Sequence, residues 1–183
     1  MAESMNGSGW GKKAFVAINL VGGPLVLGSY WWGVTAPAQQ TSLWGAVPAD
    51  IQPLYTANMF VAAAGYFFFS HYILRHLDGE RVRIPGLGGF AAFNICYFAI
   101  LIPSALWLPL TRWMIDAPGP GRWAAVLAVL WTTAAGSLGV LWGVAKATPQ
   151  GAKGRTLAIL GALGFCLQTV ILDAILWPLW FNG

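Results

Sequence analysis

The sequence predicts an all-α membrane protein, a single-domain bundle of five transmembrane helices. Of the 183 residues, 57% are hydrophobic and only 9% are charged, whereas about a quarter of the residues in an average soluble domain carry a charge. Five apolar stretches are also long enough to cross a hydrocarbon core of roughly 30 Å, which takes about 20 helical residues. A water-facing surface cannot be built from this composition.

The five predicted spans are separated by charged or Pro- and Gly-rich segments. "RHLDGERVRIPGLGG" divides the second span from the third, "DAPGPGR" the third from the fourth, and "KATPQGAKGR" the fourth from the fifth. Such segments are typical of turns and loops. The predicted spans lie near residues 14–34, 54–74, 89–111, 123–145 and 156–180.

The first span also has features of a secretory signal. Lys12 and Lys13 precede an apolar run, and "APA" at 36–38 is similar to a cleavage site. However, the run is longer than the 7–15 residues of a signal, and it contains Asn19 and Pro24. These features favour a retained helix, while cleavage would leave four spans.

The distribution of charge predicts the orientation. Short cytoplasmic loops retain an excess of Lys and Arg. Eight of the ten basic residues fall on the side of the N-terminus and the second and fourth loops. We therefore expect the N-terminus in the cytoplasm and the C-terminus outside, in a plasma membrane or a bacterial inner membrane. Topology also explains the net charge of +4 without a nucleic-acid partner. The eight are Lys12, Lys13, Arg75, Arg81, Arg83, Lys146, Lys153 and Arg155; the other two are Arg112 and Arg122.

Eight of the eleven tryptophans lie toward the predicted outer face, with Trp10 and Trp142 toward the inner face and Trp131 between. An interfacial aromatic belt would explain this pattern. The alternative is an outward-facing aromatic pocket for a flat apolar ligand such as a sterol, quinone, carotenoid or tetrapyrrole. The outer loop, 35–53, is long and holds Trp44, so it is a candidate cover for such a pocket.

Polar residues inside the spans supply the remaining candidates. Helical spacing places Cys166, Thr169, Asp173, Trp177 and Trp180 on one stripe, and two further stripes occur on the second and third spans. Interhelical hydrogen bonding is the simpler explanation for the neutral members. The candidate ligand-binding residues are Trp44, Tyr55, Asn58, Asn94, Tyr97, Trp107, Arg112, Thr169, Asp173, Trp177 and Trp180.

Asp173 raises the sharpest question, because a carboxylate within a span is costly unless it is paired or functional. Arg112 is a candidate cationic partner, and Thr169, Asn58 and Tyr55 are candidate neutral partners. A paired carboxylate would lock helices together. A functional one would bind a cation or proton, or orient a ligand.

Small residues predict where helices pack closely. Ala135, Gly139 and Gly143 repeat at four-residue spacing on the fourth span, and Gly161 lies between Ala158 and Ala162 on the fifth. Such patterns allow helix backbones to approach each other. We therefore expect the fourth span to pack on the fifth through these residues.

In its format of five spans, small size and abundant Trp, the chain is similar to the tryptophan-rich sensory proteins, which bind porphyrins and cholesterol-like molecules. The relevant segments read "SLWGAVPADIQPLY" in the first loop and "FNICYFAILIPSALW" in the third helix. They differ from that family's Trp- and Pro-rich loop and Asn- and Trp-bearing helix. The chain is therefore not assigned to that family.

No GxSxG, HExxH, phosphate-loop or dinucleotide motif occurs in the sequence. One carboxylate without a second acid or an activated nucleophile is a poor catalytic set, and no cofactor or metal is indicated. The sequence favours a non-enzymatic protein, surrounded by lipid, that binds or transports an apolar molecule. The alternatives are a proton or ion channel or transporter that uses Asp173, and an accessory, pigment-binding subunit that associates with copies of itself or with partner subunits.

Overall fold

The computed structural model describes residues 7–35, 42–149 and 153–181, and the regular secondary structure in these ranges is helical. The last span, Arg155–Phe181, consists of an α-helix, Arg155–Cys166, followed by a π-helix and a short α-helix. The elements in chain order are α1 (Gly7–Thr35), η2 (Ser42–Trp44), α2 (Gln52–His76), α3 (Ala91–Asp116), α4 (Pro120–Lys146), α5 (Arg155–Cys166), η3 (Leu167–Leu176) and α6 (Trp177–Phe181).

Five of these helical segments are long and apolar enough to cross a membrane, which confirms the predicted all-α fold class and identifies a multi-pass membrane protein. The largest differences from the predicted bounds are at the start of α1, which begins at Gly7 rather than near residue 14, and at the end of α3, which continues five residues past 111. Arg112 does not end the helix, because its guanidinium donates a hydrogen bond to the Gly33 carbonyl at 2.6 Å.

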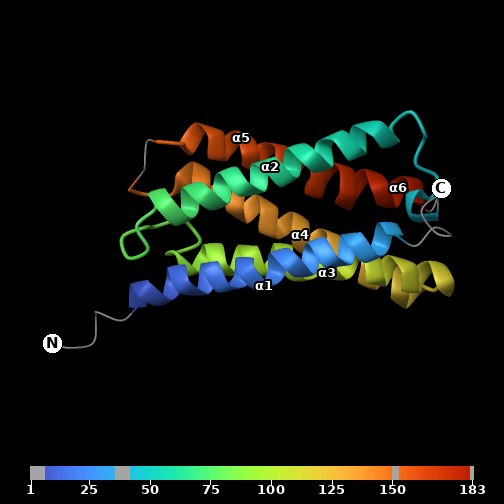
Figure 1. Ribbon diagram of the computed structural model, residues 1–183, viewed down its shortest axis with the longest axis horizontal. Coiled ribbons are helices and arrows are strands. Elements are labelled where there is room, and N and C mark those ends of the chain that lie inside the picture. The colour runs from blue at the N-terminus through green and yellow to red at the C-terminus, as the bar shows by residue number, and fades with distance from the viewer. Residues whose placement is uncertain (1–6, 36–41, 150–152, 182–183) are drawn as a thin grey trace.

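The helices run side by side along the long axis of the molecule (Figure 1). α1 packs along α3, α3 along α4, and α2 along α5, while α4 also contacts α5 and η3. We call the two ends of the bundle the tryptophan end and the basic end. The tryptophan end holds Trp44, Trp107, Trp123, Trp177 and Trp180, and the basic end holds Lys12, Arg75, Arg83, Lys146 and Arg155.

Small residues do mediate close packing, but not between the helices expected from the sequence. A Cβ on Gly143 would lie 2.5 Å from the nearest atom of the Phe93 ring, so this face of α4 packs on α3. Gly139 likewise packs against Cys96 of α3. Gly161 instead meets Gly65 of α2, where a Cβ would lie 2.8 Å from the Gly65 Cα. α4 does contact α5, as expected, but Gly139, Gly143 and Gly161 pack on other helices. A repeat of small residues shows which face of a helix is thin and not which helix it meets.

The basic half of the bundle is filled by aromatic side chains. Phe69, Phe93 and Tyr97 are fully buried in one cluster that includes Phe15. The loop between α2 and α3 closes this end, since Arg83 forms a backbone bridge with Thr148. This packing leaves the opposite, tryptophan half as the place where the bundle is hollow.

Candidate functional site

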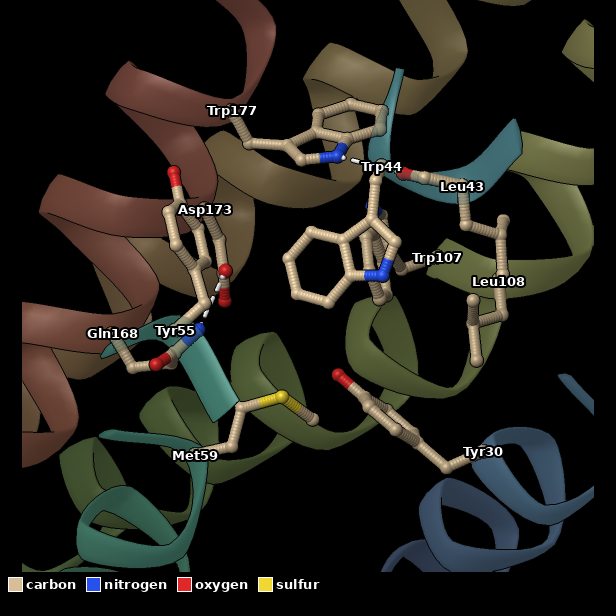
Figure 2. Close-up of a pocket in the computed structure, with 10 residues that line it drawn as sticks. All are labelled: Tyr30, Leu43, Trp44, Tyr55, Met59, Trp107, Leu108, Gln168, Asp173 and Trp177. Atoms are coloured by element: carbon tan, nitrogen blue, oxygen red, sulfur yellow. Dashed lines mark hydrogen bonds between the residues drawn. The ribbon is translucent and has the colours of Figure 1, made fainter. Parts of the chain in front are cut away.

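A cavity of about 370 Å³ lies in the tryptophan half of the bundle. Its lining comes from α1, η2, α2, α3, η3 and α6, so segments from all along the chain meet there (Figure 2). The cavity is not sealed, because Met59 remains 37% exposed. The lining residues are Tyr30, Leu43, Trp44, Tyr55, Met59, Trp107, Leu108, Gln168, Asp173 and Trp177.

Among the described residues, the hydrogen bonds that join α1 to α2 lie in the basic half. There, the Lys12 ammonium donates to the Leu74 carbonyl at 3.0 Å, and the Tyr66 hydroxyl donates to the Asn19 side-chain oxygen at 2.5 Å. Toward the other end, α1 follows α3 and α2 follows α5. The space that opens between these two pairs is the cavity.

The described part of the first loop borders this space. Leu43 and Trp44 of η2 line the cavity, and the Trp177 indole N–H donates to the Leu43 carbonyl at 3.0 Å. This bond attaches η2 to α6 (Figure 2). The segment 36–41 of the predicted cover lies outside the described residues.

The π-helix η3 places Gln168 and Asp173 together. Five residues advance an α-helix by about 500°, which leaves the two side chains roughly 140° apart around the axis. In a π-helix, backbone bonds join residues five apart, so five residues make about one turn. The Gln168 side-chain amide accordingly donates to Asp173 Oδ1 at 2.8 Å (Figure 2).

A chain of amides supports this pair. Asn58 Nδ2 of α2 donates to Gln168 Oε1 at 3.1 Å and to the Gly164 carbonyl at 3.4 Å. Because the Gln168 oxygen is used in this way, its nitrogen faces the Asp173 carboxyl group. The Tyr55 hydroxyl adds a second link from α2, donating to the Leu172 carbonyl at 3.0 Å. Asp173 Oδ2 accepts no hydrogen bond from the described residues.

Aromatic rings form most of the remaining wall. Ring centroids lie 5.8 Å apart for Trp44 and Tyr55, 5.9 Å for Trp107 and Trp177, and 6.0 Å for Tyr30 and Trp107. The Trp107 indole N–H is buried without a partner among the described residues. The cavity therefore offers flat apolar surfaces, indole N–H and hydroxyl groups, and one carboxyl group.

Five of the eleven candidate residues line this cavity: Trp44, Tyr55, Trp107, Asp173 and Trp177. Two more adjoin it. The Trp180 ring packs 6.4 Å from the Tyr55 ring, and Asn58 reaches Asp173 through Gln168.

Four candidates lie elsewhere. Thr169 donates to Ser137 of α4 at 2.9 Å, and Asn94 donates to the Gly11 carbonyl at 3.0 Å. The Tyr97 hydroxyl pairs with Ser70 at 2.7 Å, inside the aromatic cluster of the basic half. Thr169 leaves the predicted stripe because the π-helix changes the register between it and Asp173.

Arg112 is not the partner of Asp173, contrary to the expectation from sequence. Its guanidinium donates to the Gly33 carbonyl near the end of α1 and lies 4.2 Å from the centroid of the Trp32 ring. A cation is favoured at the C-terminal end of a helix, where carbonyls lack intrahelical donors. Arg112 therefore joins α3 to α1.

Sequence analysis missed five lining residues: Tyr30, Leu43, Met59, Leu108 and Gln168. The side chains of Leu43, Met59 and Leu108 carry no signal that distinguishes them from lipid-facing ones. Gln168 is a polar residue within a span, but α-helical spacing assigns it to a different face from Asp173. Tyr30 stands beside Trp31 and Trp32 and is not distinguishable from an interfacial belt.

At the basic end, His71 and His76 lie with ring centroids 5.8 Å apart. Over the described ranges, no three His, Cys, Asp or Glu residues gather into a group that could hold a metal ion. Asp78 nearby accepts a hydrogen bond from the Glu80 backbone N–H at 2.8 Å, which lowers the pKa of its carboxyl group.

No protein-family model matches this chain, and neither a curated protein sequence nor a solved structure shows significant similarity to it. The geometry alone therefore defines the class: a five-helix, multi-pass membrane protein with an aromatic cavity at one end.

Proposed function

We propose that the protein binds a small, largely apolar molecule in the cavity at the tryptophan end, and that this end faces outward from the cytoplasmic membrane. The observation that carries the proposal is the cavity itself, which has aromatic walls and polar groups without a hydrogen-bond partner among the described residues, including the Trp107 N–H and Asp173 Oδ2.

The size and chemistry of the cavity support a binding site. Ligand pockets usually measure about 300–1,000 Å³, with mostly apolar walls and few polar groups. Close-packed interiors contain few voids larger than a water molecule, so a space of about 370 Å³ between spans is unusual and supports a binding site. Flat aromatic walls suit planar ligands, which include sterols, quinones, carotenoids and tetrapyrroles.

The proposed orientation rests on the ends of the bundle. The helix ends and the loop at the end opposite the cavity carry five basic residues: Lys12, Arg75, Arg83, Lys146 and Arg155. An excess of Lys and Arg is typical of cytoplasmic loops. A ligand would accordingly enter from the outer leaflet or from the outside medium.

Binding is preferred to ion conduction because of the packing below the cavity. A conduction path from Asp173 would have to cross the basic half, where Phe15, Phe69, Phe93 and Tyr97 are fully or almost fully buried against one another. Conduction needs a polar or water-filled route, whereas the described residues of this cluster are mostly apolar and closely packed.

The test compares the probe affinity of a variant whose new side chain fills the cavity with that of a variant whose new side chain lies away from it. Met59→Trp adds a bulky ring to the lining, whereas Phe60→Trp replaces a side chain that is 73% exposed. Each variant is reconstituted in lipid nanodiscs and titrated with 9-methylanthracene, a neutral planar probe, while Trp emission is recorded. Empty nanodiscs supply the partitioning background.

We expect wild type and Phe60→Trp to bind the probe and Met59→Trp to lose at least about tenfold in affinity, because the probe loses apolar contact area. Equal binding by both variants would place any bound probe outside the cavity and contradict the proposal. A mass spectrum of the gently purified protein would then show whether a cellular molecule co-purifies.

A further inference from the structure

We infer that the molecule bound in this cavity is a lipophilic organic cation, whose positive charge lies between the Asp173 carboxylate and the aromatic walls. This inference rests on the proposed binding function and specifies the chemical class of the ligand.

The first argument is the missing counter-charge. Within the described ranges a single ion pair forms, between Arg81 and Asp78 at the basic end. No Lys, Arg or His lines the cavity, and the adjoining segment 36–41 contains none in its sequence. A carboxylate inside a membrane protein is normally paired or functional, so a cation that pairs with Asp173 would come from outside the chain.

The second argument is the direction in which Asp173 is held. Asn58 orients Gln168, and Gln168 donates to Oδ1 of Asp173. This relay holds the carboxyl group as a hydrogen-bond acceptor and leaves Oδ2 without a donor. The carboxyl group lines the cavity together with Tyr55 and Trp177 (Figure 2). A cation placed there would receive a charge-assisted contact.

The third argument is the aromatic wall. Cations are attracted to the faces of Trp and Tyr rings, and aromatic cages are a common way to bind quaternary ammonium groups. Two arginines at the tryptophan end already use this contact: Arg112 lies 4.2 Å from the Trp32 ring centroid, and Arg122 lies 4.4 Å from that of Trp113. The tryptophans of the cavity make no such contact with a cation of the described chain.

These three features together select against other ligands. An acidic ligand would place a second negative charge beside Asp173, and like charges in a site of low polarity repel strongly. A neutral planar ligand would use the aromatic walls and leave the carboxylate without a partner.

The experiment uses probes of one shape that differ in charge. N-methylacridinium and 9-methylanthracene are planar and isosteric, because a positive ring nitrogen in the first replaces a ring carbon in the second. Both are titrated against wild type, Asp173→Asn and Asp116→Asn in nanodiscs of neutral lipid. Asp116 is an exposed carboxylate on α3, so its variant removes the same charge away from the cavity.

We expect Asp173→Asn to weaken N-methylacridinium binding by about ten- to a hundredfold, as for the loss of a charged partner. Binding of 9-methylanthracene should change little, and Asp116→Asn should leave both affinities unchanged. Comparing variants with the same probe cancels partitioning of that probe into lipid.

If both probes bind wild type and Asp173→Asn equally well, the cation inference is overturned and the proposed function stands. If neither probe binds better than to empty nanodiscs, the proposed function fails too. Should Asp173→Asn not fold, wild type is compared with three probes, adding the anion 9-anthracenecarboxylate. The affinity for each probe is corrected for its binding to empty nanodiscs and to nanodiscs with Met59→Trp. The corrected affinity must then be highest for the cation, lower for the neutral molecule and lowest for the anion. Equal affinities for the three probes overturn the inference.

Discussion

Gly161→Ala is expected to separate α2 from α5 and to destabilise the bundle. A Cβ on Gly161 would lie 2.8 Å from the Cα of Gly65, whereas non-bonded carbon atoms pack at about 3.5–4.0 Å. The helices would have to move apart by about 0.7 Å or more to relieve this contact. The neighbouring group on each side is backbone, so no side chain can rotate away.

The expected loss in the free energy of unfolding is about 1–3 kcal/mol, the usual cost of overpacking a well-packed interior. The assay is unfolding in mixed micelles of dodecyl maltoside and dodecyl sulfate, followed by circular dichroism. Gly161→Ala should unfold at a lower fraction of dodecyl sulfate than wild type. Binding of the planar probe should weaken as well, since α2 carries Tyr55 and Met59 while η3 carries Asp173.

Gly28→Ala on α1 provides the control, because a Cβ there has no atom within 4 Å. Alanine favours a helix over glycine by up to about 1 kcal/mol, and the control measures that gain without a packing cost. A Gly161→Ala protein that is as stable as the Gly28→Ala protein would refute the close α2–α5 contact.

Two further predictions follow from the cover and the topology. Trp177→Phe keeps an aromatic ring but removes the hydrogen bond to the Leu43 carbonyl. It should lower the free energy of unfolding by about 0.5–1.5 kcal/mol and speed amide hydrogen exchange over residues 42–47. Unchanged exchange there would show that this bond does not hold η2. A reporter that is active only in the cytoplasm, fused after Gly183, should be silent because the positive-inside rule places the C-terminus outside, and a strong signal would reverse the proposed orientation.

The spans were predictable because their signal is local. Length and apolar composition decide whether a segment can cross a membrane, and the five helices confirm the prediction. The residues at which the spans begin and end were less predictable. Arg112 suggests the end of the third span, but the helix continues to Asp116 because the arginine is satisfied by the Gly33 carbonyl of another helix.

The partners of polar and small residues could not be predicted in the same way. Helical spacing indicates which residues share a face, while the neighbouring helix depends on how all five pack. Gly161 therefore met Gly65 of α2 rather than α4, and Tyr97 joined Ser70 in the basic half rather than the cavity.

The sequence by itself determined that this chain is an all-α membrane protein with aromatic residues concentrated toward one end and basic residues toward the other, since each property follows from composition and order along the chain. Only the tertiary structure decided that Trp44, Tyr55, Trp107, Asp173 and Trp177 enclose one cavity with Tyr30 and Gln168. The physical reason is that the cavity depends on two features: the pairing of α1 with α3 and of α2 with α5, and a π-helix that turns Gln168 toward Asp173.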